Sequence, residues 1–200
     1  TLSNKSQNES ITQTIVRMID GTLESNKNGI FLKLDEQTEV PLSATASSIK
    51  ELSPLLLWVQ TGTIEEDSMC IEEPEAHAHP NMQYDIADLL AACMMKGTLM
   101  QITTHSDYLL ARLNQLIRLH NLKQTDANRF EAICTDKGID KNLTLDKNLI
   151  NAYYFYKDNV THQVKIEKQK VDNGIPFTTF SNAVQEQIDW DETFNTQDDE

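Results

Sequence analysis

The sequence predicts an α/β fold in which a largely parallel sheet is flanked by helices. Two apolar segments, residues 68–72 and 98–104, have the length of strands. Between them, Pro80 begins a segment with apolar residues at helical spacing, and Gly97 ends it. A strand, a helix and a second strand in this order favour a parallel pair joined by a crossover helix.

The rest of the chain is expected to add further helices and a hairpin near the C-terminus. Residues 152–157 and 160–168 predict two strands joined by a turn. Aromatic residues in the first of these strands are expected to pack within the protein and not to stack on bases. The other expected elements are helices near residues 11–21, 47–59, 106–117, 126–133 and 176–188, and a strand at 30–34. Residues 1–10 are polar and are expected to be frayed.

Composition points to one acidic globular domain. The 200 residues are enough for a hydrophobic core, and the formal net charge is −14. Such a surface repels phosphate backbones, so DNA remains a possible ligand of a longer parent protein but is not supported by this chain. Much of the charge lies in an acidic tail at about residues 189–200.

The cysteines and the apolar runs indicate in which cellular compartment the protein is expected. Cys70, Cys93 and Cys134 are too widely spaced for a disulfide framework or a zinc pattern, and the first two lie in apolar segments. We therefore expect buried thiols and a reducing, cytoplasmic compartment. No apolar run approaches the roughly 20 residues of a bilayer span, so no membrane partner is expected. The chain begins at Thr1, not at Met, which predicts a piece of a longer protein.

The two predicted parallel strands end in residues suited to phosphoryl transfer. Glu72 and Glu73 end the first strand, and Thr104, His105 and Ser106 end the second. The carboxyl ends of neighbouring parallel strands meet at one edge of a sheet, where α/β proteins bind ligands. Phosphoryl transfer depends mostly on positioning and charge neutralisation, so one metal-holding and one water-orienting carboxylate suffice. An imidazole beside them is suited to sensing a phosphate.

These segments resemble motifs of ABC-type ATPases. Residues 70–80 read Cys-Ile-Glu-Glu-Pro-Glu-Ala-His-Ala-His-Pro, and residues 102–106 read Ile-Thr-Thr-His-Ser. They are similar to the Walker B, D-loop and switch-histidine segments of SMC-like and AAA-annotated ATPases, including OLD-family and bacterial defence-system proteins. The resemblance covers about residues 15–170 and implies the C-terminal lobe of an ABC-type P-loop ATPase. No Gly-Lys dipeptide occurs, so the phosphate-binding Walker A part is expected to lie outside this chain.

The resemblance implies a role for each residue of these motifs. Glu72 would hold Mg²⁺ through water, and Glu73 would polarise the water that attacks the γ-phosphate of ATP. The family usually has Asp at the position of Glu72. His105 would hydrogen-bond the γ-phosphate, which makes Glu73 and His105 the catalytic candidates. Glu75 and His77 belong to the segment that resembles the D-loop, which crosses the dimer interface in the family and aligns the nucleotide site of the partner.

A further loop resembles the ABC signature. Residues 41–52 read Pro-Leu-Ser-Ala-Thr-Ala-Ser-Ser-Ile-Lys-Glu-Leu, with Ser47 and Ser48 at the start of a predicted helix. A helix N-terminus with hydroxyl groups can receive the γ-phosphate of a nucleotide held by a partner subunit. The family's usual glycine is replaced here by Ile49. An ordinary serine cap of the helix is the structural alternative.

The leading hypothesis is ATP hydrolysis in the parent protein, in a DNA-repair-like or antiviral defence ATPase. This chain would supply the four segments to an ATP-sandwich homodimer, with a separate effector protein as a further possible partner, and the isolated chain is expected to be inactive. The alternative is a non-catalytic α/β dimerisation or partner-binding domain with remnant ATPase motifs. A third hypothesis, a zinc hydrolase built on His77, His79 and Glu73, needs another ligand, for which only His105 is suitable.

Overall fold

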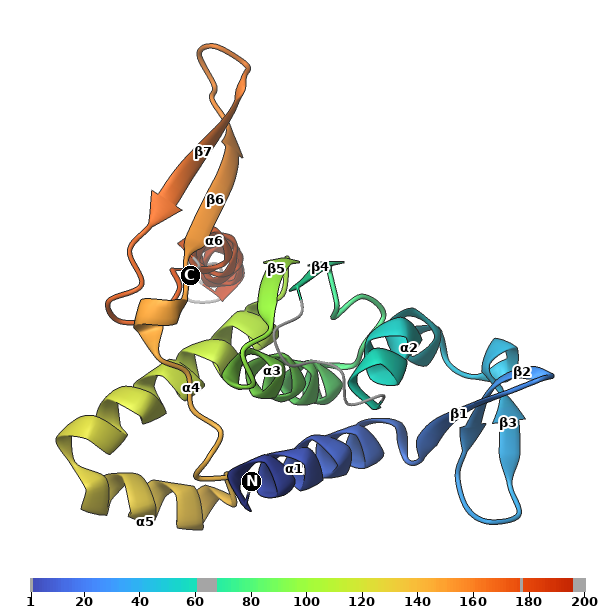
Figure 1. Ribbon diagram of the computed structural model, residues 1–200. Helices are drawn as coiled ribbons and strands as arrows, with labels where there is room; N and C mark the ends of the chain where they lie inside the picture. Colours follow the sequence, from blue (N-terminus) through green and yellow to red (C-terminus); the bar gives the residue numbers. More distant parts are fainter. Residues whose placement is uncertain (1, 61–67, 177, 196–200) are drawn as a thin grey trace.

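The computed structural model describes the backbone of residues 2–60, 68–176 and 178–195. Helices and strands follow one another along the chain as in a mixed α/β protein (Figure 1). The elements are α1 (Leu2–Ile19), β1 (Thr22–Asn26), β2 (Gly29–Lys33), β3 (Glu39–Pro41), α2 (Ser47–Gln60), β4 (Ser68–Glu72), α3 (Pro80–Met95), β5 (Leu99–Thr103), α4 (Asp107–Thr125), α5 (Ala127–Lys137), β6 (Ala152–Lys157), β7 (Val164–Gln169) and α6 (Thr178–Asn195), with 3₁₀ turns at Leu42–Ala44 and Lys147–Leu149.

The described strands form three separate sheets. β4 and β5 pair in parallel, with Glu72 opposite Thr103. β1, β2 and β3 form an antiparallel sheet, and β6 and β7 form an antiparallel hairpin. The α/β class, the parallel sheet with its helices and the C-terminal hairpin are confirmed. Among the described strands, parallel pairing is limited to β4 and β5. The strand predicted at residues 30–34 is β2, and it pairs instead in an antiparallel sheet with residues 22–26 and 39–41, which the sequence analysis did not assign.

Four helices, α1 to α4, supply most of the hydrophobic core, and α5 adds Phe130 and Cys134. α3 packs against α1 and α4, and α2 packs against α1. Each of these helices contributes a fully buried side chain, namely Ile15, Leu56, Leu90 and Leu116. Pro80 at the first position of α3 and the Ser106 side chain, which accepts a hydrogen bond from the Leu109 N–H at 3.0 Å, fix where α3 and α4 begin. α4 therefore begins four residues after the end of β5, and α3 begins after the turn at residues 73–79 that follows β4.

The parallel sheet is covered on one face only. Met69 and Ile71 of β4 lie opposite Met100 and Ile102 of β5, and these four side chains pack against the core. The alternate residues of both strands, including Cys70, are exposed. The prediction that both strands and the Cys70 thiol are buried is therefore wrong, because no described element covers the second face.

The two ends of the described chain differ from expectation. α1 begins at Leu2, so the prediction of a frayed segment before residue 11 is wrong for residues 2–10. Most of these residues are Ser and Asn, which are only moderately unfavourable in a helix, by less than about 0.7 kcal/mol each relative to Ala. α6 continues through Asn195 and includes part of the expected acidic tail, while residues 196–200 lie outside the described residues. The hairpin of β6 and β7 projects from the helical body (Figure 1), and Tyr153, Tyr154 and Phe155 are exposed, contrary to the expected packing.

Candidate functional site

The two adjacent glutamates lie where β4 ends, at the carboxyl edge of the parallel sheet. Glu72 is the last residue of β4, and the Glu73 N–H extends the sheet by donating to the Thr103 carbonyl at 2.9 Å. Both side chains are exposed at this edge. Glu73 has a φ of 45°, in the left-handed region that non-glycine residues rarely adopt. The backbone therefore turns sharply at the residue expected to orient water.

The structure brings the two catalytic candidates together. His105 follows the end of β5, and its Nε2 atom lies 3.7 Å from the Glu73 Oε1 atom. The His105 side chain is 85% exposed and that of Glu73 is 53% exposed. A carboxylate and an imidazole at this distance can share a bound water or a phosphate oxygen. The edge of the sheet thus presents an acid and a base to solvent.

Glu75 lies behind this pair and faces the protein interior. The residue is 7% exposed, and its Oε1 atom accepts hydrogen bonds from the Thr104 hydroxyl and from the His105 backbone N–H, the latter at 3.0 Å. The turn after β4 is therefore tied to the segment after β5 through one carboxylate. In this conformation Glu75 positions His105 and does not present its own carboxylate at the surface.

The turn between β4 and α3 is tightly folded. The Ala76 N–H donates to the Glu73 carbonyl at 2.9 Å, and the Ala78 N–H donates to the Glu75 carbonyl at 3.0 Å. His77 has a φ of 60°, which like that of Glu73 costs on the order of 1–3 kcal/mol. Strained residues persist only where the surroundings hold them, and they cluster at functional sites.

Two buried oxygens near this turn have no hydrogen-bond partner. Within the described side chains, the buried polar atoms without a partner are Glu75 Oε2 and Asp107 Oδ1. Asp107 is the first residue of α4, directly after the His105-Ser106 pair, and burial raises the pKa of its carboxyl above the usual range. Unpaired buried polar groups are uncommon in native proteins and call for an explanation. Their location beside the strained residues marks this edge of the sheet as the candidate site.

His77 links this turn to the segment that resembles the ABC signature. Its Nε2 atom lies 3.4 Å from the Glu51 Oε1 atom, in the first turns of α2. α2 begins at Ser47, and Ala46 precedes it, so neither serine caps the helix as the structural alternative proposed. Ser47 is exposed, whereas Ser48 is 8% exposed and lies against the core. Only Ser47 therefore offers its hydroxyl at the surface.

The donor set at the sheet edge fits magnesium held together with phosphates. Mg²⁺ is bound in nucleotide sites by one or two carboxylates plus phosphate oxygens, without an all-protein cage. Glu72 supplies such a carboxylate, and no group of three or more His, Cys, Asp or Glu side chains in the described part of the chain is arranged to hold a metal. The histidines proposed for zinc have separate contacts: His77 meets Glu51, the His79 ring accepts from the Asn81 N–H, and His105 meets Glu73.

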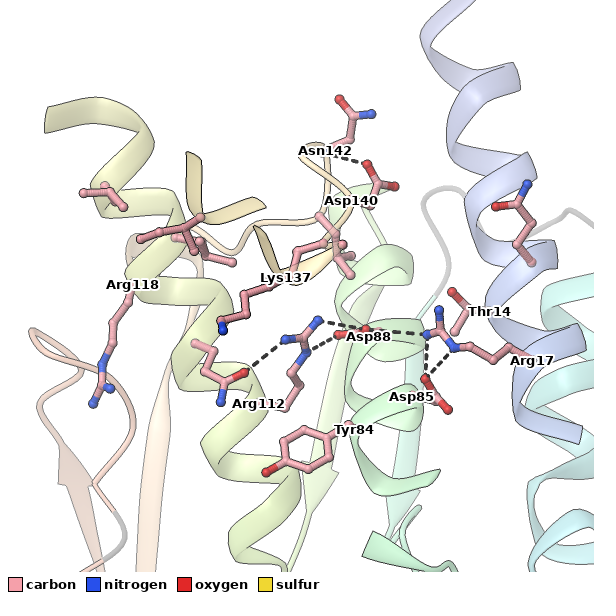
Figure 2. Close-up of a pocket in the computed structure, with 18 residues that line it drawn as sticks. Thr14, Arg17, Tyr84, Asp85, Asp88, Arg112, Arg118, Lys137, Asp140 and Asn142 are labelled. Atoms are coloured by element: carbon pink, nitrogen blue, oxygen red, sulfur yellow. Dashed lines mark hydrogen bonds and ion pairs between the residues drawn. The ribbon is translucent and has the colours of Figure 1, made fainter. Parts of the chain in front are cut away.

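A cavity of about 950 Å³ lies elsewhere, between α1, α3, α4 and α5. In Figure 2, Arg17 reaches Asp85, and Arg112 forms a two-point contact with Asp88, at 2.7 and 3.1 Å. Burial raises the pKa of the Asp88 carboxyl, and the Arg112 hydrogen bond opposes that shift. None of the sequence-predicted site residues lines this cavity. We interpret its charged pairs as links between α1, α3 and α4.

Comparison with known families identifies the class. A family model described as an AAA ATPase domain matches residues 2–110, more than half of the chain and all of the edge described above. The chain belongs to the AAA ATPase domain family. Such ATPases use ATP and Mg²⁺, in agreement with the donor set of the sheet edge. Across the described residues of this AAA ATPase domain, no helix combines the length and apolar character needed to cross a membrane.

Two further comparisons were made with solved structures and with curated proteins. One solved structure, from work on the structural biochemistry of ATP-driven dimerization and DNA-stimulated activation of SMC ATPases, aligns over 93% of this AAA ATPase domain and 92% of that chain. Its sequence identity is 11% and its TM-score 0.48, a likeness too low to support inference. No curated protein matches the chain.

Several contacts of the site were not predicted from the sequence. Glu51 is the fifth residue of α2 and reads as an ordinary helical acid, and Thr104, although part of the segment that resembles the switch-histidine motif, was assigned no contact of its own. Gln83 accepts a hydrogen bond from the Ser106 hydroxyl, which also caps α4. Only the folded chain brings these residues next to the site.

Proposed function

We propose that this AAA ATPase domain hydrolyses ATP in an ATP-bridged homodimer of the full-length protein. The observation that carries the proposal is the approach of Glu73 and His105 at the carboxyl edge of the parallel sheet, with 3.7 Å between the side chains. Membership of the AAA ATPase domain family supports the reaction class. The ABC-type arrangement, with signature, Walker B, D-loop and switch segments, is our extension of that class.

Each residue at the edge has a distinct task in this proposal. Bound Mg²⁺–ATP would supply the reacting phosphate and a charge-neutralising cation. Glu73 accepts a proton from the attacking water and orients it, while His105 donates a hydrogen bond to the phosphate oxygen that gains charge. Glu72 would hold Mg²⁺ through water. Glu75 keeps His105 in place through the backbone hydrogen bond described above.

The partner subunit would approach over His77 and Ser47. His77 lies next to Glu51 of α2, so the turn after β4 and the start of α2 form a continuous surface. Ser47 is the exposed hydroxyl at the N-terminus of α2, where backbone N–H groups favour an anion. Ser48 is buried, so we now assign it to packing and assign the phosphate contact to Ser47 alone.

The phosphate-binding loop of the proposed site would come from outside these 200 residues. The chain has no Gly-Lys dipeptide with which to build one. The exposed second face of β4 and β5 supports this proposal, because parallel sheets are usually covered on both faces. The 200-residue chain by itself is expected not to hydrolyse ATP, since too few groups neutralise the triphosphate.

The test compares two single substitutions in the full-length protein. Glu73→Gln keeps the size of the side chain but removes the base, so ATP still binds while turnover falls at least about a hundredfold. The nucleotide-bridged form should then accumulate and be visible by sedimentation as an increase in mass over the same protein without nucleotide. Glu72→Gln is the matched control: it should raise the Mg²⁺ concentration needed for binding and should not trap the dimer. Turnover at the parental rate in Glu73→Gln would remove Glu73 from the mechanism.

The alternative function, a non-catalytic dimerisation or partner-binding domain, is favoured by two departures from the motif. Glu72 replaces the usual aspartate, and Ile49 replaces the signature glycine. Under this alternative Glu73→Gln leaves nucleotide binding, dimerisation and any background hydrolysis unchanged. The two functions therefore give opposite results in the same experiment.

A further inference from the structure

The C-terminal helix, α6, adds no described side chain to the hydrophobic core. Every side chain described for α6, from residue 184 to residue 194, is exposed. Most of the stability of helices in proteins comes from packing an apolar face against other elements. An 18-residue helix that buries no described side chain is therefore expected to be covered by something else.

α6 is amphipathic, which tells what kind of surface would cover it. Val184, Ile188, Trp190 and Phe194 lie within an arc of roughly 160° when drawn at about 100° per residue. Trp190 is 61% exposed and stacks on Phe194, with 6.1 Å between ring centroids. Asp189 lies on the opposite side, Glu186 and Glu192 lie just outside the two ends of the arc, and Asp191 lies within it. The helix thus presents four large apolar side chains together with one carboxylate, flanked by two more.

The hairpin of β6 and β7 presents a second uncovered apolar face. Paired residues of an antiparallel ladder lie on the same face, and Phe155 pairs with Ile166. The same face carries Tyr153 and Val164, and each of these four side chains is more than half exposed. A two-stranded hairpin without a packed face is marginally stable in water. The β6–β7 hairpin is therefore also expected to pack against another surface.

The charges at the two surfaces are complementary. Lys168 pairs with Tyr153 and Lys157 pairs with Val164, so a lysine stands at each end of the apolar face of the hairpin. Neither lysine forms an ion pair within the described residues. The acidic residues that border or interrupt the apolar arc of α6 are Glu186, Glu192 and Asp191. Apolar side chains can therefore meet in the centre while opposite charges meet at the rim, as in many protein interfaces.

A second copy of the chain is the occupant that best fits these surfaces. The backbone of Ile175 is held by the Asn114 side chain through hydrogen bonds of 2.6 and 2.9 Å, and α6 begins only three residues later. In this arrangement the faces of the helix and of the hairpin are both left exposed within one chain. Two copies related by a two-fold axis would cover both helices and both hairpins at once.

We propose that the chain forms a two-fold homodimer in which α6 of each copy packs on the β6–β7 hairpin of the other. This interface uses none of the residues assigned to the sheet edge with Glu73 and His105, and it requires no nucleotide. It is therefore independent of the proposed ATPase function. Apolar contact supplies the attraction, and the lysine and acidic rims set the orientation.

The first test measures the mass of the 200-residue chain by sedimentation over a concentration series without nucleotide. We expect a dimer that dissociates on dilution. Phe155→Asp in the hairpin and Trp190→Asp in the helix should each raise the dissociation constant roughly tenfold or more. Leu149→Asp is the matched control, because Leu149 is 80% exposed but belongs to neither surface, and it should leave the dimer unchanged.

Mixing the two variants separates this interface from the other pairings. A Phe155→Asp chain keeps an intact helix, and a Trp190→Asp chain keeps an intact hairpin, so one complete contact returns only in the mixed pair. The mixture should dimerise more tightly than either variant alone. A hairpin–hairpin or helix–helix interface gives no such recovery. A chain that stays monomeric at all concentrations, with α6 folded on its own hairpin or covered by nothing, overturns the proposal.

Discussion

The carboxylate of Glu75 accepts a hydrogen bond from the backbone N–H of His105, which follows thirty residues later in the chain. The same oxygen accepts from the Thr104 hydroxyl, and the other oxygen of Glu75 is buried without a partner. One buried side chain thus joins the turn after β4 to the segment after β5. The separation between Glu73 and His105 depends on this link.

Replacing Glu75 should lower both the stability of the fold and the ATP turnover of the site. Glu75→Ala removes two hydrogen bonds and should lower the free energy of unfolding by about 1–3 kcal/mol. In the full-length protein it should also reduce ATP turnover roughly ten- to a hundredfold, because His105 is no longer held in place. Glu75→Gln keeps an acceptor oxygen and should retain most of both. Urea unfolding and steady-state turnover measure the two effects; equal turnover in both variants would contradict a positioning role.

Ser47 allows stability and assembly to be changed in opposite directions. Ser47→Glu places a negative charge in the first turn of α2, which should stabilise the helix by about 0.3–1 kcal/mol. The same charge occupies the place proposed for the partner's phosphate, so the ATP-dependent dimer of the Glu73→Gln full-length protein should be lost. Ser25→Glu, on the exposed side of β1, is the control and should leave that dimer intact. Thermal unfolding and sedimentation with Mg²⁺–ATP are the measurements.

The sequence predicted the elements around the site because their ends carry local determinants. Pro80 occupies the first position of α3, where proline is favoured, Ser106 caps α4, and Gly97 adopts a φ of 96° after α3. Their positions, and the approach of Glu73 and His105 that follows from parallel pairing, could be expected from the residues alone. β1 and β3 could not, because short half-exposed strands carry few apolar residues.

Burial and long-range contacts were the part that the sequence did not determine. The sequence of an apolar strand such as residues 98–104 does not show whether other elements cover one face of the strand or both. The exposure of Cys70 and Leu99 therefore depends on neighbouring elements. The sequence analysis placed Glu75 in the segment that resembles the D-loop but not beside the His105 backbone, and Asn114 reads as an ordinary polar residue of a helix. Their partners lie 30 and 61 residues away, at positions that only the folded chain brings near.

Gly174 and Gly29 together allow conformational strain to be separated from a steric clash. Both have a positive φ, 114° and 129°, which an alanine adopts at a cost of about 1–3 kcal/mol. A Cβ atom on Gly29 meets nothing within 4 Å, whereas one on Gly174 comes within 2.6 Å of the Asn114 Oδ1 atom. Gly174→Ala should therefore destabilise the chain by about 1–2 kcal/mol more than Gly29→Ala. Equal unfolding free energies for the two variants would show that Asn114 yields without cost.

Asp158 makes the turn of the β6–β7 hairpin sensitive to acid. A hydrogen bond from the Lys165 side chain, followed by bonds from the Thr161 N–H and hydroxyl, lowers the pKa of this carboxyl from 3.8 to about 2. Because the folded-state pKa is the lower one, the stabilisation is fully present above pH 3.8 and is lost as the pH falls towards 2. The turn should therefore hold at neutral pH and loosen in strong acid.

Amide chemical shifts can follow this titration directly. The N–H groups of Val160 and Thr161 donate to Asp158 Oδ1 at 3.1 and 2.7 Å, so their shifts should change with a midpoint near pH 2. Lys165→Met removes the largest cause of the shift and should move the midpoint upward, towards 3.8, while the Thr161 bonds keep it below that value. Asp158→Asn should abolish the titration. A titration midpoint at pH 3.8 in the chain without substitutions would mean that the Lys165 contact does not hold in solution.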